Sequence, residues 1–153
     1  MTSPTATSPR DVLGRSLAAA VERGPAAFAD LFAVDGALEY PFAPIGIPRR
    51  IQGREQIRAH LAGRQTATLL RFRGYRSTAI HQTDDPEVIV AELELHGTVV
   101  TTGQPVVLPS IAVVRVRDGE ILSYRDYFNP LAPAEATGRL PELFAMLTGE
   151  QPT

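Results

Sequence analysis

Apolar residues in the first part of the chain recur at the spacing of amphipathic helices. This pattern predicts a helix from Asp11 that ends at Gly24, because the proline that follows cannot continue the backbone hydrogen-bond ladder. Pro25 is placed to begin a second helix, and a third is expected over residues 53–63. Residues 37–40 predict a short strand between the second and third helices, and a proline-rich loop ends it.

The rest of the chain changes to the alternation that is typical of half-buried strands. We expect strands over residues 69–82, 88–100, 106–117 and 121–128, with turn residues between them. Asp35 and Gly36 predict a turn before the first strand, and an interrupted helix is expected over residues 134–147. Helices followed by a meander of strands predict an α+β fold: a cone-shaped, curved antiparallel sheet wrapped around the N-terminal helices and enclosing a pocket.

Length and charge narrow the class of protein. The chain has 153 residues, which fit a single domain over residues 10–148 behind a disordered leader at residues 1–9. The net charge of −2 offers no basic surface for nucleic acid, and no apolar run approaches the ~20 residues that span a bilayer. The absence of cysteine excludes disulfides and thiolate metal sites. We therefore expect a cytoplasmic protein that binds neither nucleic acid nor membranes.

The last predicted strand carries a carboxylate on an apolar face. Strict alternation places Leu122, Tyr124, Asp126 and Phe128 together, and it places Ile121 on the opposite face. Burial without a partner raises the pKa of a carboxyl group, and a raised pKa suits a general acid or base near neutral pH. The alternative is an aspartate that hydrogen-bonds to backbone or pairs with an arginine for structural reasons.

The long strand over residues 88–100 carries a polar cluster. Glu92, Glu94 and His96 share one face, and Leu93 and Leu95 lie on the other. One interpretation is a solvated outer face opposite the core. The other is a polar wall of the pocket, which a bulge near the end of the strand would produce by exchanging the two faces.

Tyr40 ends the first predicted strand, next to the loop that would cover the pocket. Its hydroxyl group could donate to a substrate oxygen or to Asp126, or its ring could lie in the core with the hydroxyl in water. His60 and His81 are expected at the surface or at the rim. Because the three histidines lack the spacing of metal ligands, we expect no metal and no other cofactor.

Two stretches of the chain resemble SnoaL-like proteins, namely residues 38–57 and residues 118–129. That group is similar in fold to ketosteroid isomerase, nuclear transport factor, limonene epoxide hydrolase and the PhzA/PhzB proteins. The segment Tyr124 to Phe128 is similar to the last strand of the epoxide hydrolase, where the aspartate is catalytic. A catalytic glutamate of the PhzA/PhzB proteins falls at a similar position. Both likenesses imply a catalytic role for Asp126.

The resemblance implies an enzyme but departs from the epoxide hydrolase pattern. Tyr40 matches a tyrosine that holds water in that enzyme, but Phe42 stands where an asparagine is needed, and neither Glu92 nor Glu94 supplies its arginine. The implied function is therefore cofactor-independent acid/base proton transfer on an apolar, carbonyl-bearing small molecule, of the isomerase or cyclase type. The candidate catalytic residues are Asp126 and Tyr40, and the candidate substrate-binding residues are Tyr124, Phe128, Phe42, Glu92, Glu94 and His96.

The same fold also serves proteins that are not enzymes, so a ligand-binding or dimerisation module is the alternative. The pairing of Asp126 distinguishes the two. A free carboxyl group that faces a cavity favours catalysis, whereas a carboxylate locked to Arg54, or to Arg125 of a second copy, favours a structural role. In either case we expect a homodimer that binds an apolar small molecule, because an open curved sheet leaves a broad outer face to cover.

Overall fold

The structure is a computed structural model that describes residues 8–67 and 69–150. Its elements in chain order are α1 (Pro9–Arg23), the 3₁₀ helix η1 (Pro25–Leu31), β1 (Phe32–Glu39), β2 (Arg50–Gln52), α2 (Arg54–Ala67), β3 (Leu70–Gln82), β4 (Val88–Val99), β5 (Pro105–Arg117), β6 (Glu120–Phe128), α3 (Leu131–Ala136) and α4 (Leu140–Thr148). Residues 1–7 of the predicted leader lie outside the described residues. Its last two residues are Ser8, which caps α1, and Pro9, which begins it.

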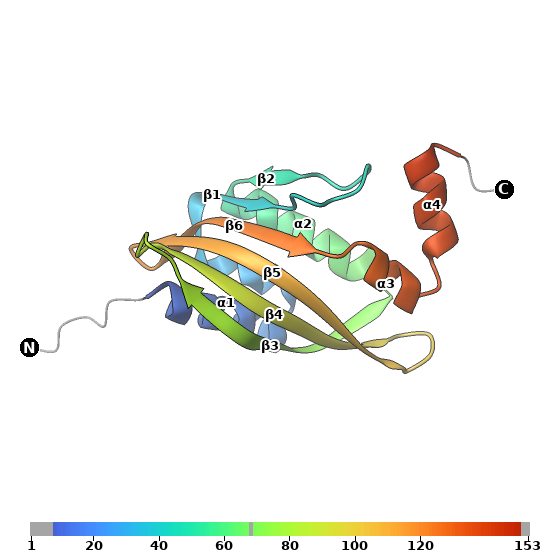
Figure 1. Cartoon of the computed structure of the whole chain (residues 1–153), viewed down its shortest axis with the longest axis horizontal. Coiled ribbons are helices and arrows are strands. Elements are labelled where there is room, and N and C mark those ends of the chain that lie inside the picture. The colour runs from blue at the N-terminus through green and yellow to red at the C-terminus, as the bar shows by residue number, and fades with distance from the viewer. Residues whose placement is uncertain (1–7, 68, 151–153) are drawn as a thin grey trace, which may run out of the picture.

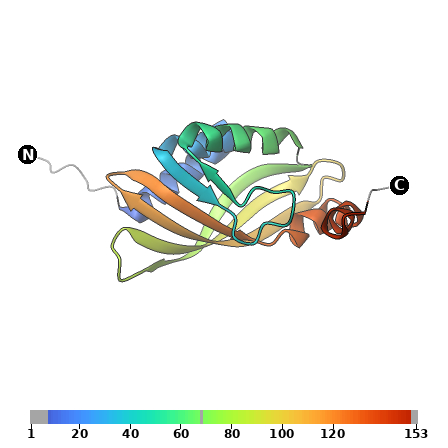
Figure 2. The same ribbon diagram turned by 90° about the horizontal axis from the view of Figure 1, so that it is seen from above.

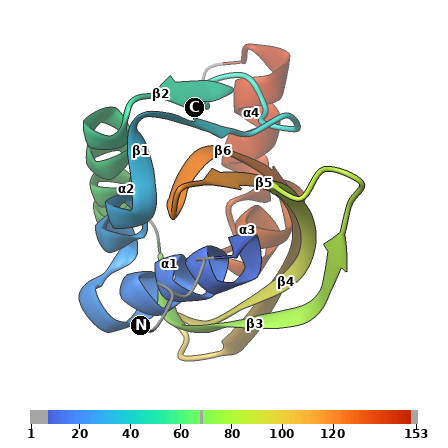
Figure 3. The same cartoon turned by 90° about the vertical axis from the view of Figure 1, so that its left-hand side faces the viewer.

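The strands form one curved sheet that confirms the predicted α+β cone. Its six strands lie in the order β2-β1-β6-β5-β4-β3. Neighbouring strands are antiparallel with one exception, the parallel pair of β1 and β6. Figure 3 shows the sheet curling around α1, and Figure 2 shows α1 and α2 on the same side of the sheet. In Figure 1, α3 and α4 lie at the end of the sheet away from the N-terminus.

Local sequence signals explain most helix boundaries. α1 begins before Asp11 because the side-chain oxygen of Ser8 accepts a hydrogen bond of 3.2 Å from the Asp11 N–H and caps the helix. α2 continues past Gly63, where we predicted its end, because a glycine weakens a helix without stopping it. The interrupted C-terminal helix is confirmed as two short helices, separated at Gly138 with a φ of 70°.

Among the described residues no helix is both long and apolar enough to cross a membrane.

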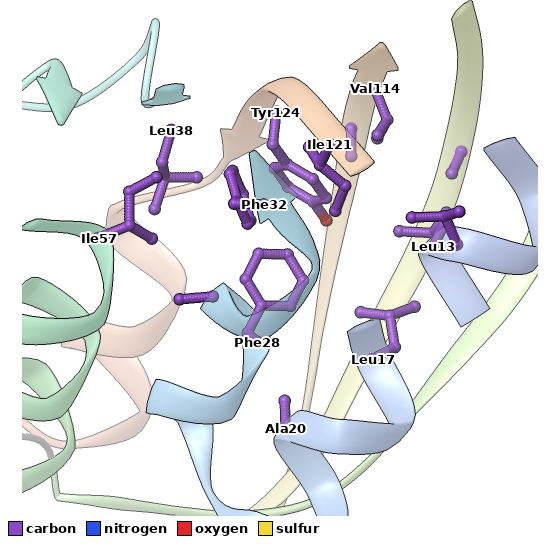
Figure 4. Close-up of a cluster of buried hydrophobic side chains, with 14 of the residues drawn as sticks. Leu13, Leu17, Ala20, Phe28, Phe32, Leu38, Ile57, Val114, Ile121 and Tyr124 are labelled. Atoms are coloured by element: carbon purple, nitrogen blue, oxygen red, sulfur yellow. The ribbon is translucent and has the colours of Figure 1, made fainter. Parts of the chain in front are cut away.

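The core lies between the helices and the concave face of the sheet. Figure 4 shows Phe28 and Phe32 beside Tyr124, with Leu13 of α1 and Ile57 of α2 on either side. The ring of Phe28 meets Phe32 and Tyr124 edge-on, at centroid distances of 5.5 and 5.0 Å. Such edge-to-face pairs add to the free energy gained by burying the rings. This cluster fixes the base of β6, the strand that carries Asp126 further along.

The turn predicted at Asp35 and Gly36 is wrong, because β1 runs through both residues. Its register with β6 shifts between Phe32 and Ala37, so the glycine belongs to an irregularity inside the strand. A Cβ atom on Gly36 would lie 2.8 Å from the carbonyl oxygen of Ile121. The glycine therefore permits a close approach of β1 to β6.

A second bulge lies in β6 and corrects the predicted faces of two residues. Ser123 pairs with Arg115 and Ile121 pairs with Val116, which leaves Leu122 as the extra residue. Ile121 is consequently fully buried in the core, on the same side as Tyr124, and strict alternation assigned Ile121 and Leu122 to the wrong faces. Beyond the bulge the alternation of β6 is regular again.

Candidate active site

A cavity of about 190 Å³ lies between the helices and the concave face of the sheet. Its lining comes from both long helices, from β1 and from the four strands β3 to β6, and most of it is apolar. Of the described residues that line it, Arg64 and Asp126 alone are charged. An apolar cavity with a few polar groups directed into it is the usual form of a small-molecule site.

Asp126 extends from β6 into this cavity, opposite Ala112 of β5. The residue is half-buried, but its Oδ1 atom is shielded from solvent and has no hydrogen-bonding partner among the described residues. Burial raises the pKa of Asp126 to about 6, and the nearby charge of Arg64 lowers it. A buried carboxyl oxygen without a partner is uncommon in a structural role, since such atoms are normally hydrogen-bonded.

Tyr40 lies beside the cavity and contacts His60. Its hydroxyl oxygen is 3.2 Å from Nε2 of His60, and its ring meets Phe128 edge-on at 5.4 Å. Burial raises the pKa of Tyr40 to about 12. Burial also lowers the pKa of His60, as does the charge of Arg64. His60, which we expected at the surface or rim, is half-buried against Tyr40, and its lowered pKa makes it a neutral imidazole at pH 7.

Two further tyrosines border the cavity, Tyr75 of β3 and Tyr124 of β6. Burial raises the pKa of Tyr75 to about 12 and that of Tyr124 well above its usual value, with a smaller effect from the charge of Asp126. Within residues 8–67 and 69–150 neither hydroxyl group has a hydrogen-bonding partner. Both are therefore protonated donors that a bound ligand could use. We predicted Tyr124 as a site residue but did not single out Tyr75.

Tyr75 and Arg64 were missed because the sequence gives no local signal for either. Tyr75 faces inward because it pairs with Leu95, another residue that lines the cavity, and this is visible only once the register of β3 and β4 is known. Arg64 lies beyond the predicted end of α2. Its guanidinium carbon lies 5.5 Å from the ring centroid of Tyr40 and 5.8 Å from that of Phe128.

The polar cluster of β4 is not brought to the cavity. Leu93 is buried against the core, so Glu92, Glu94 and His96 lie on the outer face of the sheet, and the first of the two interpretations holds. Carboxylate oxygens of Glu92 and Glu94 lie 2.8 and 3.0 Å from the Nε2 atoms of His81 and His96. The alternation of β4 is unbroken because the extra residue near its end belongs to β3, between Phe72 and Gly74.

Phe42 also lies away from the cavity. Its side chain is 64% exposed, and its ring packs edge-on against Tyr127 at 5.2 Å. Phe42, Glu92 and Glu94 border a separate open groove on the outer face of the sheet. Of the predicted site residues, the structure therefore brings together Tyr40, Tyr124, Asp126 and Phe128.

A curved sheet that packs helices on its concave side and keeps a cavity between them defines the class of cone-shaped α+β pocket proteins. The family model of the SnoaL-like domain matches residues 13–124. Because this match covers most of the sequence, the chain belongs to the SnoaL-like family.

Individual relatives agree with this assignment. The chain is 38% identical over 119 residues to an uncharacterised PhzA/B-like protein of Pseudomonas aeruginosa, covering 77% of this chain and 82% of that protein. A Bacillus subtilis structure that is provisionally named an isomerase has a TM-score of 0.76 and 29% identity, over 86% of this chain and 93% of that chain. A protein of Catenulispora acidiphila with a ketosteroid isomerase-like fold has a TM-score of 0.67 and 25% identity, over 84% and 92%. The resemblance inferred from the sequence is confirmed for family and fold.

Proposed function

We propose that the protein is a cofactor-independent enzyme that moves a proton on an apolar, carbonyl-bearing small molecule, as an isomerase or a cyclase does. The observation that carries the proposal is the side chain of Asp126, which lines an apolar cavity and whose buried Oδ1 atom lacks a hydrogen-bonding partner in the described part of the chain. The alternative structural role needs a backbone or an arginine partner, and Oδ1 of Asp126 has neither among the described residues. Arg54 instead donates to the carbonyl oxygen of Phe32. A relative provisionally named an isomerase supports the same reaction class.

Asp126 is the group that moves the proton. With a pKa of about 6, roughly ten carboxylates stand against one carboxylic acid at pH 7. The carboxylate removes a proton from the carbon next to the carbonyl group. The electron pair of the C–H bond forms a C=C bond, and the π pair of the C=O bond moves to the oxygen. The protonated Asp126 then returns the proton to the same carbon or to a conjugated one. A pKa near the working pH favours both halves of this cycle.

The tyrosine hydroxyl groups stabilise the oxygen on which negative charge develops. Tyr75 and Tyr124 border the cavity with protonated hydroxyls, and Tyr40 lies beside them with its hydroxyl next to His60. A fixed donor at a developing oxyanion typically contributes about 10²–10³ in rate. The epoxide hydrolase pattern gains no support, because Phe42 points away from the cavity.

Hydrogen exchange into a model ketone tests the proposal without knowledge of the natural substrate. 2-Tetralone is a two-ring apolar ketone, and its deuterium uptake from D₂O is followed by proton NMR. The wild-type protein should accelerate uptake next to the carbonyl group, and Asp126→Asn should reduce this acceleration by at least about 100-fold.

The matched control is Glu92→Gln, which removes a carboxylate from β4 on the outer face of the sheet. This variant should exchange deuterium at the wild-type rate. If the wild-type protein exchanges 2-tetralone no faster than Asp126→Asn, proton transfer by Asp126 is wrong, and the ligand-binding alternative takes its place.

A further inference from the structure

A guanidinium group at the edge of the cavity is held in place by aromatic rings. Arg64 belongs to the last turn of α2, borders the cavity and is also exposed to solvent, so it stands at the opening. Its guanidinium carbon lies over the ring of Tyr40 at 5.5 Å and over that of Phe128 at 5.8 Å. Cation–π attraction of this kind orients an arginine without using its N–H donors.

Arg64 differs in its pairing from the arginines around it. Arg58 on the same helix pairs with Asp30 and Glu55, and Arg23 also pairs with Asp30. Across residues 8–67 and 69–150, Arg64 forms no ion pair with any carboxylate. Apart from a side-chain hydrogen bond with Tyr40, its N–H donors are therefore not engaged by a carboxylate and are available to a ligand that enters the cavity.

Asp126 does not use these donors. Its Oδ1 atom has no hydrogen-bonding partner among the described residues, so the positive charge of Arg64 acts on it only through space. The cavity thus has a carboxyl group inside and a guanidinium group at its opening, and the two do not neutralise each other by direct contact. Most of the remaining lining is apolar, with Leu93, Leu95 and Leu108 on the sheet side.

We propose that the cavity binds a small apolar acid, whose carboxylate pairs with Arg64 at the opening and whose one or two rings fill the apolar interior. The planar guanidinium fork matches the two oxygens of a carboxylate, and this pairing is stronger beside an apolar surface than in water. A cavity of about 190 Å³ limits the ligand to a small molecule. This inference rests on the proposed function in that it names the ligand class of the same cavity, although binding needs no turnover.

Two probes that differ in charge and share one ring system test the inference. 2-Naphthoate carries the carboxylate, and 2-naphthamide replaces it with a neutral group of similar shape. In calorimetric titrations at pH 7, the wild-type protein should bind 2-naphthoate more tightly. Arg64→Met keeps the unbranched stem and removes the charge, so it should weaken 2-naphthoate by about tenfold and change 2-naphthamide by less than about twofold.

The control is Arg15→Met, which removes an exposed arginine from α1 and should change neither affinity. Backbone amide shifts of Leu93 and Tyr124 on titration should locate both probes in the cavity. The inference is overturned if the wild-type protein binds the two probes equally or binds neither, or if Arg64→Met weakens both to the same extent. Circular dichroism of each variant identifies any loss of folding.

The tetralone experiment separates this inference from the proposed function. Because 2-tetralone is neutral, its deuterium exchange by the wild-type protein requires no ion pair with Arg64. A preference for 2-naphthoate without exchange would contradict the proposed function alone. Exchange without a preference for 2-naphthoate would contradict the acidic ligand alone.

Discussion

Replacing Asp126 by asparagine is expected to stabilise the fold at neutral pH and to remove one source of pH dependence. Burial raises the pKa of Asp126 in the folded protein to about 6, from 3.8 in an exposed aspartate. Between these two values the folded protein keeps a proton that the unfolded chain has released. Because the folded state then binds more protons, the free energy of unfolding falls as the pH rises through this window.

The size of this effect follows from the two pKa values. The interval from 3.8 to about 6 corresponds to about 3 kcal/mol, at about 1.4 kcal/mol for each pH unit. The stabilisation of the fold by protonated Asp126 is complete below pH 3.8 and is mostly lost by about pH 6. It levels off above that pH. Asparagine has nearly the same shape and does not titrate. The unfolding free energy of Asp126→Asn, relative to wild type, should therefore grow by about 2–2.5 kcal/mol from about pH 4 to about pH 8.

Urea unfolding followed by circular dichroism at several pH values in this range measures the difference between the two proteins. Subtracting one from the other cancels the titration of every group that they share. Glu120→Gln, at an exposed position on the same strand, is the control and should show no comparable trend. A constant difference would mean that burial does not perturb Asp126. A difference that shrinks with rising pH would mean that the carboxylate is ion-paired. Either result refutes the reasoning.

Two other outcomes are expected. Binding of 2-naphthoate should weaken from about pH 5 to about pH 7.5, because Asp126 gains a negative charge inside the cavity; calorimetry should show that Asp126→Asn makes this trend clearly smaller than in the wild type. The tyrosines around Asp126, namely Tyr40, Tyr75 and Tyr124, stay protonated in this range, whereas His60, beside Tyr40 and with a lowered pKa, is the other group that can gain a proton as the pH falls. Gly97→Ala should destabilise the fold by about 1–3 kcal/mol, because its Cβ would lie 2.6 Å from the carbonyl oxygen of Arg71. Thermal unfolding measures this loss, and Gly14→Ala, in open space on α1, should show none.

The face of Asp126 could be predicted because the signal is local. Alternation along β6 places Tyr124, Asp126 and Phe128 together, and these three residues follow the bulge at Leu122, so the bulge does not disturb them. The bulge itself depends on how β6 pairs with β5. For that reason strict alternation failed for Ile121 and Leu122.

The remainder of the site depends on packing between elements that lie far apart in the sequence. Arg64 reaches the cavity because α2 continues past Gly63, which brings the guanidinium group over the rings of Tyr40 and Phe128. The sequence predicted His60 at the surface or rim, and its contact with Tyr40 appears only in the structure. A sequence pattern describes one element at a time, whereas these contacts join a helix to two strands. The expected homodimer stays a prediction.

The parallel pairing of β1 with β6 has a consequence for how the protein folds. These strands come from opposite parts of the chain, and their pairing brings the neighbourhood of Tyr40 to that of Asp126. Contacts between distant segments require the closure of a long loop and tend to form late in folding. The cavity therefore exists only after the first and last strands have met. In a refolding experiment, the return of ligand binding would report completion of the whole sheet, and partly folded chains would have secondary structure without a binding site.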